Sequence, residues 1–334
     1  MNIGITQKNI ITKDSLLYNG CALLYTITAY TLGIIGLFSQ DILINIISII
    51  VLAHGMIIAA YLVHECAHNL IFKKMLHNTY LGRILTWLCG ASYGTYEDIR
   101  YKHFRHHVDN DDVVWFDYED FFRKHPLILK ITQILEWFYI PIHEIIMHII
   151  MAFTSFIIEE RRDQRRRNIS VLLLRSSLFI FISLYFPVVA LYYLVSYVIM
   201  MTVLRFMDSI QHDYSYNLTL FSNDRPERKG DHEWEQEHTF SNPISMKIPV
   251  LNWLVLNFGF HNAHHSDMTI PWYQLQEKHK EMFGDNSINH VPFLAQLKIF
   301  HKQRVNRIID NHTCLLYTSP SPRDATLSRM PSSA

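Results

Sequence analysis

The chain has 334 residues, 49% of them hydrophobic, and its 30 basic and 30 acidic side chains give a formal net charge of zero. This balance gives no indication of a polyanionic partner such as a nucleic acid. The four cysteines show no CxxC or paired spacing, so neither a disulfide framework nor a thiolate metal site is expected. Acidic and polar residues precede the first apolar run, which argues against a cleaved signal peptide.

Four apolar runs approach the length of about 20 residues that a helix needs to cross a membrane. Each run is apolar on all sides, whereas a surface helix of a soluble protein is apolar along one stripe. A soluble core would have to bury all four, and the rest of the chain is too polar to cover them. We therefore expect an all-α fold with four transmembrane helices in two tight hairpins, at residues 20–38, 42–63, about 170–186 and about 187–206.

The charges beside these runs predict their orientation. Residues 159–167 (EERRDQRRR) lie just before the third run, whereas the turns of both hairpins lack Lys and Arg. Because basic residues beside a span mark the cytoplasmic side, both hairpins should enter from the cytosol. Residues 64–169 and the chain from 207 onward should then be cytosolic. Within the former, residues 127–153 mix aromatic residues and histidines with aliphatic ones, which indicates a helix lying on the membrane surface.

Eight of the twenty histidines lie in three motifs: HECAH, HFRHH and HNAHH. On a helix, residues three or four apart share a face, so each motif would direct its imidazoles toward one point. Converging imidazoles repel one another when they are protonated, so such a cluster is unfavourable unless the rings bind a shared metal. Eight exceed the three or four ligands of one zinc ion, and two metals fit the count. The candidate ligands are His64, His68, His103, His106, His107, His261, His264 and His265.

HECAH, HFRHH and HNAHH in this order, with paired apolar runs before the first and after the second, resemble the membrane fatty acid desaturase/hydroxylase family over about residues 20–300. The resemblance implies two irons, O₂ as co-substrate, a lipid acyl substrate, and a cytosolic helical cap that carries the histidine boxes on a four-span scaffold. It also implies a ninth ligand at the end of the fourth span, where Asp208 and His212 are four residues apart on one expected helical face and His212 is the candidate. His238 is a rival for this place, although its very polar surroundings favour a solvated loop. The role of Asp208 stays open.

Several other polar residues have two interpretations. Glu65, inside the first motif, is expected to orient ligand imidazoles from behind, and Asp98, Asp109 and Asp111 are either such partners or solvated acids. Cys66 points away from the histidine face and should pack as a small hydrophobic residue. The histidines outside the motifs are assigned to interfaces or the surface, among them His54, His77, His125, His143, His148 and His279.

The favoured function is the O₂-dependent introduction of a double bond into a long acyl chain. A lipid or carotenoid hydroxylase or ketolase of the same family would use the same motifs. HECAH also matches the HExxH motif of zinc metalloproteases, with Glu65 as general base, but this alternative leaves both HxxHH motifs unexplained. A non-enzymatic metal carrier would not explain the helical spacing. Because no HPGG haem motif or dinucleotide fingerprint occurs, electrons should come from a separate ferredoxin or cytochrome b5 type carrier.

The composition predicts three segments. Residues 1–19 form an N-terminal cytosolic segment, and residues 20–312 form one membrane domain. Residues 313–334 break in composition, with Ser, Pro and Arg but no periodicity. Such a stretch reads as a disordered tail, and it resembles non-native read-through.

Overall fold

The computed structural model describes residues 13–214, 217–222, 226–284 and 290–309, so the predicted tail at 313–334 lies outside the described residues. Four helices are long and apolar enough to cross a membrane, as the sequence predicts. They are α1 (Lys13–Gly36), α2 (Ile42–Ala67), α8 (Arg165–Tyr185) and α9 (Pro187–Asp208).

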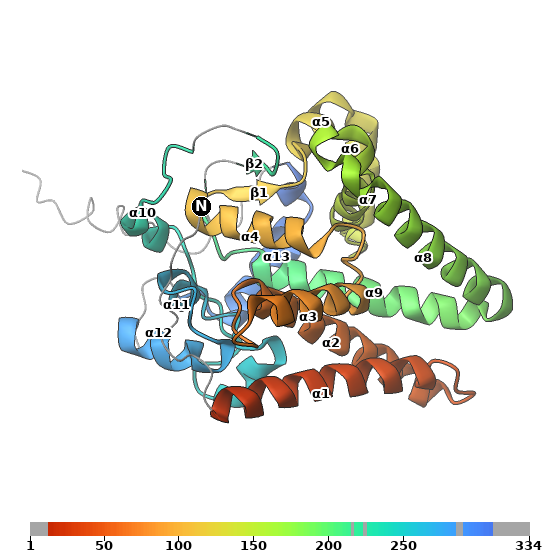
Figure 1. Cartoon of the computed structure of the whole chain (residues 1–334), viewed down its shortest axis with the longest axis horizontal. Helices are drawn as coiled ribbons and strands as arrows, with labels where there is room; N and C mark the ends of the chain where they lie inside the picture. The colour runs from red at the N-terminus through yellow and green to blue at the C-terminus, as the bar shows by residue number, and fades with distance from the viewer. Residues whose placement is uncertain (1–12, 215–216, 223–225, 285–289, 310–334) are drawn as a thin grey trace, which may run out of the picture.

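These helices pair as two hairpins, and α2 also packs on α9 (Figure 1). In the first hairpin, a Cβ on Gly33 would lie 2.7 Å from that of Leu52, so glycine permits the close approach of α1 and α2. Asp41 ends the turn as the N-cap of α2 and accepts a 2.8 Å hydrogen bond from the N–H of Leu43. Pro187 starts α9 directly after α8, because its fixed φ suits a first helical turn. The predicted hairpins are confirmed.

The third long helix, α8, exposes most of its side chains and begins earlier than the apolar run, within the basic stretch. Its one charged residue beyond that stretch, Arg175, lies against the C-terminal end of α3 (Met75–Leu88). The Arg175 guanidinium donates a 2.6 Å hydrogen bond to the carbonyl of Trp87 and lies 5.2 Å from the centroid of that ring. Free carbonyls at a helix end thus satisfy a cation that would be costly in lipid.

Most of the shorter elements gather at one end of the long helices, opposite the turn between α8 and α9, and form a cap (Figure 1). The α4 helix begins at an N-cap, Thr95, whose hydroxyl accepts a 3.1 Å hydrogen bond from the N–H of Asp98. The shorter α-helices described after α3 are α4 (Tyr96–Asp109), α5 (Tyr118–Lys124), α6 (Pro126–Trp137), α7 (Ile142–Ile157), α10 (His232–Glu237), α11 (His261–Ser266), α12 (Leu275–Phe283) and α13 (Phe293–Gln303). Short 3₁₀ turns are η1 (Glu159–Gln164), η2 (Pro249–Val255), η3 (Trp272–Gln274) and η4 (Asn306–Ile308).

A two-stranded parallel sheet departs from a purely helical fold. Strand β1 (Asp112–Val114) follows α4, and strand β2 (Asn217–Thr219) follows α9. Their register pairs Val113 with Leu218, and both residues are buried. The sheet therefore fixes the segment after the second histidine motif against the segment after the fourth long helix.

The segment predicted to lie on the membrane surface forms two helices, α6 and α7, with a break between them. Tyr139 in the break has φ 62°, in the left-handed region. Arg304 from the segment after α13 supports the break by donating to the carbonyls of Trp137 at 2.6 Å and Glu136 at 3.1 Å. Apolar side chains on α6 are exposed, including Leu127 and Trp137. Contact of this face with lipid remains a prediction.

Candidate metal centre

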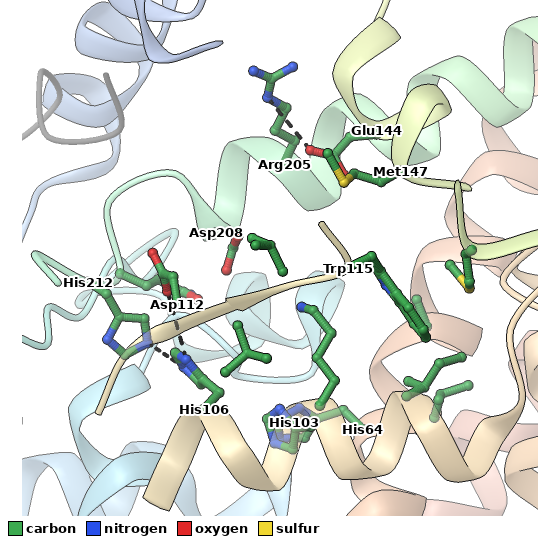
Figure 2. Close-up of a pocket in the computed structure, with 18 of the residues that line it drawn as sticks. His64, His103, His106, Asp112, Trp115, Glu144, Met147, Arg205, Asp208 and His212 are labelled. Atoms are coloured by element: carbon green, nitrogen blue, oxygen red, sulfur yellow. Dashed lines mark hydrogen bonds and ion pairs between the residues drawn. The ribbon is translucent and has the colours of Figure 1, made fainter. Parts of the chain in front are cut away.

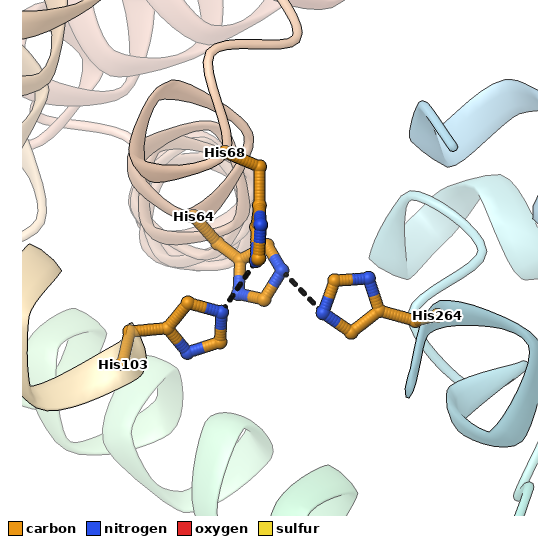
Figure 3. Close-up of side chains that lie close together, drawn as sticks. All are labelled: His64, His68, His103 and His264. Atoms are coloured by element: carbon orange, nitrogen blue, oxygen red, sulfur yellow. Dashed lines mark hydrogen bonds between the residues drawn. The ribbon is translucent and has the colours of Figure 1, made fainter. Parts of the chain in front are cut away.

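The first histidine group joins three elements that are distant in the sequence. His64 and His68 come from the end of α2, His103 from α4 and His264 from α11, and their rings converge (Figure 3). One nitrogen from each lies within 4.8 Å of the others. The closest pairs of Nε2 atoms are His68 with His103 at 2.6 Å and His64 with His264 at 3.1 Å.

A second group lies beside the first. It contains His106 from α4, His261 and His265 from α11, and His212 from the segment after α9. The Nε2 atom of His212 lies 2.9 Å from that of His106 and 2.7 Å from that of His261. Figure 2 shows His106 and His212 directed toward one another.

The remaining motif histidine, His107, lies between the two groups and contacts both. Its Nε2 atom lies 3.0 Å from the Nε2 atoms of both His103 and His264. Its ring centroid is 4.2 Å from that of His265 in the second group. The nine predicted ligands thus form one continuous cluster, with four imidazoles in each group and His107 between them.

The spacing and protonation of these rings fit bound metal. Imidazole nitrogens lie about 2.0–2.1 Å from zinc, so two ligands at right angles around such an ion are about 3 Å apart. The Nε2 atom of His265 is buried and has no hydrogen-bond partner among the described residues. Burial, followed by repulsion from neighbouring imidazoles, holds the pKa of His103 and His107 well below its usual value and lowers that of His264 to about 3. The rings are therefore neutral at pH 7, which is the form that binds metal.

Outer contacts fix the orientation of the second group. The Nδ1 atom of His265 lies 2.7 Å from the buried carboxylate of Glu235, and the Nδ1 atom of His106 lies 3.0 Å from the carbonyl oxygen of Asp111. The Nδ1 atom of His212 lies 3.3 Å from the hydroxyl oxygen of Thr239. Such partners set which ring nitrogen faces a metal. Sequence reasoning did not find Glu235, because it lies 30 residues before His265 in a stretch with no histidine motif.

The carboxylates of Glu65, Asp98 and Asp109, which were candidates for orienting the ligand imidazoles, contact other groups. The carboxylate of Glu65 accepts a 3.2 Å hydrogen bond from the N–H of Trp272 instead of holding an imidazole. Asp98 binds Arg161 at 2.9 Å, and Asp109 binds Arg105 at 2.7 Å. The contact of Asp98 joins α4 to η1, and that of Asp109 lies within α4. The expectation for Glu65 is therefore wrong at the level of direct contact, although the bond ties the end of α2 to the segment after α11.

His212 reaches the site by a different route from the one expected. Helix α9 ends at Asp208, so the two residues do not share a helical face. His212 instead forms an isolated antiparallel bridge with Thr239, which places its ring in the second group. Asp208 lies at the wall of the adjoining cavity. His238 stacks on Trp234 with ring centroids 4.1 Å apart and belongs to neither group.

A cavity of about 460 Å³ adjoins both groups (Figure 2). Its wall contains apolar residues of α2 and α7 as well as charged ones, among them Glu144 and Arg205, which lie 3.9 Å apart. His143 and His148 also line the cavity, and His279 is fully buried. The assignment to interfaces or the surface is therefore wrong for His279, whose ring packs on that of Phe260 with centroids 5.1 Å apart. His143 and His148 are half-buried.

Comparison with known proteins identifies the class. A family model described as "Fatty acid desaturase" matches residues 42–293, which is most of the chain. The chain belongs to the fatty acid desaturase family. Neither the comparison with curated proteins nor that with solved structures gave a significant match. The metalloprotease alternative is not supported, because four histidines surround the HECAH motif's site and Glu65 is engaged with Trp272.

Proposed function

We propose that this protein is an O₂-dependent di-iron oxidoreductase that introduces a double bond into a long acyl chain. The observation that carries the proposal is the convergence of nine buried or half-buried imidazoles on two adjacent centres, at the end of four membrane-length helices. Imidazole suits iron, and two irons can share the electrons that O₂ reduction requires. Family membership makes the acyl substrate the expected one.

In this proposal, the first iron is held by His64, His68, His103, His107 and His264, and the second by His106, His212, His261 and His265. When bound, the two irons supply an oxidant strong enough to break an unactivated C–H bond. The chain's own residues hold the ligands neutral and fixed. Buried Glu235, the carbonyl of Asp111 and the hydroxyl of Thr239 prevent ring rotation in the second group.

The cavity is the proposed site for the reacting segment of the substrate. It borders His64, His103, His106, His212 and His261, so a bound carbon chain would lie against both groups. The methionines and aliphatic residues of its wall exclude water from that chain. The charged residues of the same wall favour a second candidate, hydroxylation, because Glu144 and Arg205 would hydrogen-bond a polar group near the reacting carbon.

We further propose that both long hairpins enter the membrane from the cytosol and that the cap is cytosolic. The support is the basic stretch before α8 and the lack of Lys and Arg in the two hairpin turns. Electrons would then come from a soluble or membrane-bound carrier on the cytosolic side.

Expression in a host with a simple lipid profile, under ¹⁸O₂, tests the reaction. The expected result is a new double bond with no ¹⁸O in the lipid, and the matched control is His264→Ala, which should give no product. An ¹⁸O-labelled hydroxyl would refute desaturation and support the second candidate. Product from His264→Ala at the level of the natural chain would contradict the metal centre itself.

A further inference from the structure

A stack of aromatic rings extends from the second histidine group to helix α10. His212 stacks on Tyr214 with ring centroids 4.3 Å apart, and Tyr214 stacks on Trp234 at 5.4 Å. Trp234 then stacks on His238 at 4.1 Å, and the interplanar angles of all three pairs are 28° or less. Aromatic pairs in proteins adopt edge-to-face geometry as well as stacking. Close packing alone would therefore not require three successive pairs of roughly parallel rings.

The two ends of the stack lie in different surroundings. At the inner end, Tyr214 is buried and its ring centroid also lies 5.6 Å from that of His106, so it contacts two members of the second group. Toward the outer end, Trp234 and His238 are both partly exposed, and the half-exposed guanidinium of Arg228 lies 5.7 Å from the ring centroid of Trp234. Figure 1 shows α10 at the outer edge of the cap, away from the turns of both hairpins. The stack thus joins the surface to the buried centre.

The stack is also separate from the substrate cavity. Neither Tyr214 nor Trp234 is among the described residues that line the cavity, although His106 and His212 are. A substrate in the cavity would therefore leave this route free. The same helix supplies Glu235, which holds His265, so α10 contacts the second group in two ways.

We propose that α10 is the docking surface for a one-electron carrier protein and that Trp234 and Tyr214 conduct its electrons to the second histidine group. The inference rests on the proposed function, which requires an external reductant. In each transfer the carrier is oxidised by one electron and the metal centre is reduced by one. Two such electrons, two protons from solvent, and the two electrons and two protons removed from the substrate reduce one O₂ to two waters. The rate of electron transfer falls steeply with distance. Stacked aromatic rings divide the route into several short transfers in place of one long one.

Rapid mixing of the iron-loaded protein with a reduced carrier tests the conducting role. We expect Trp234→Leu to slow reduction of the iron by about tenfold or more, with iron content and reduction by dithionite unchanged. Trp234→Phe should restore much of the rate, since it keeps a ring in the stack. The matched control is Trp87→Leu, because Trp87 also has a guanidinium near its ring face, that of Arg175, but lies outside the stack. Carrier-driven reduction of Trp234→Leu at the natural rate would overturn the route.

Binding to the metal-free protein tests the docking surface without any turnover. Glu233 and Glu237 are exposed on α10 four residues apart, and Glu277 and Glu281 have the same spacing and exposure on α12. Charges at the rim of an interface govern association and its salt dependence. Reversing the first pair to lysine should change the Kd of the carrier about threefold or more at low ionic strength, whereas reversing the second pair should not.

Soluble cytochrome b5 and a [2Fe–2S] ferredoxin serve as the two probes. Equal Kd values for both reversed pairs would overturn the docking surface, as would a natural chain whose iron is reduced by dithionite but by neither carrier. A natural chain that binds no reducible metal at all would instead refute the proposed function. The two failures are therefore distinguishable.

Discussion

The contact between Glu235 and His265 allows the most quantitative prediction. The buried carboxylate of Glu235 lies 2.7 Å from Nδ1 of His265 and 2.6 Å from Nδ1 of the exposed His232. Glu235→Gln keeps the size of the side chain but removes its charge and replaces one acceptor oxygen with an NH₂ donor. His265 would then be held less firmly with its Nε2 atom toward the second centre.

The expected loss of iron affinity can be calculated from two independent free-energy ranges. A hydrogen bond to a charged group contributes about 1.5–3 kcal/mol. Loss of a partner behind a metal ligand typically lowers metal affinity about 10–100-fold, which corresponds to about 1.4–2.7 kcal/mol. The two ranges agree, so we expect Glu235→Gln to weaken iron at the second centre by about 10–100-fold and to leave the first centre unchanged.

Competition with a calibrated chelator, followed by Mössbauer spectroscopy of ⁵⁷Fe-loaded protein, would measure the two centres separately. The matched control is Glu233→Gln, an exposed position on the same helix, which should retain both irons. Equal iron retention by Glu235→Gln and the natural chain would refute the reasoning. Loss of both irons together would show that Glu235 supports the fold of the cap and not one centre.

Three further predictions concern the ligands and the topology. His68→Ala should abolish activity and lower iron content while membrane insertion is retained, as measured by metal analysis of the detergent-solubilised protein; full activity would sink the ligand assignment. His212→Ala should lose iron and activity, whereas His238→Ala should retain iron, because His238 belongs to neither histidine group; the reverse pattern would show that the wrong histidine was chosen. A reporter fused after Lys302 should register as cytosolic, and an exoplasmic signal would contradict the proposed orientation.

Periodic and local patterns in the sequence were sufficient for the main architecture. Four runs of apolar residues with short turns between them predicted the two hairpins, because the length of a membrane-spanning helix is set by the thickness of the hydrocarbon layer. The spacing of HECAH and HFRHH likewise predicted which histidines share a helical face, since that geometry is local. The small sheet was not predicted, because strands of three residues leave little periodic signal.

The sequence by itself determined that eight motif histidines would be available for metal, but only the tertiary structure decided how they divide. His106 and His107 are adjacent on α4, yet the Nε2 atom of His106 contacts His212 of the second group, whereas that of His107 contacts His103 and His264 of the first. The helix directs successive residues differently. Tertiary contacts also decided the position of His212 beyond the end of α9 and the pairing of Glu235 with His265. These arrangements depend on how separate segments pack, which no local pattern of residues records.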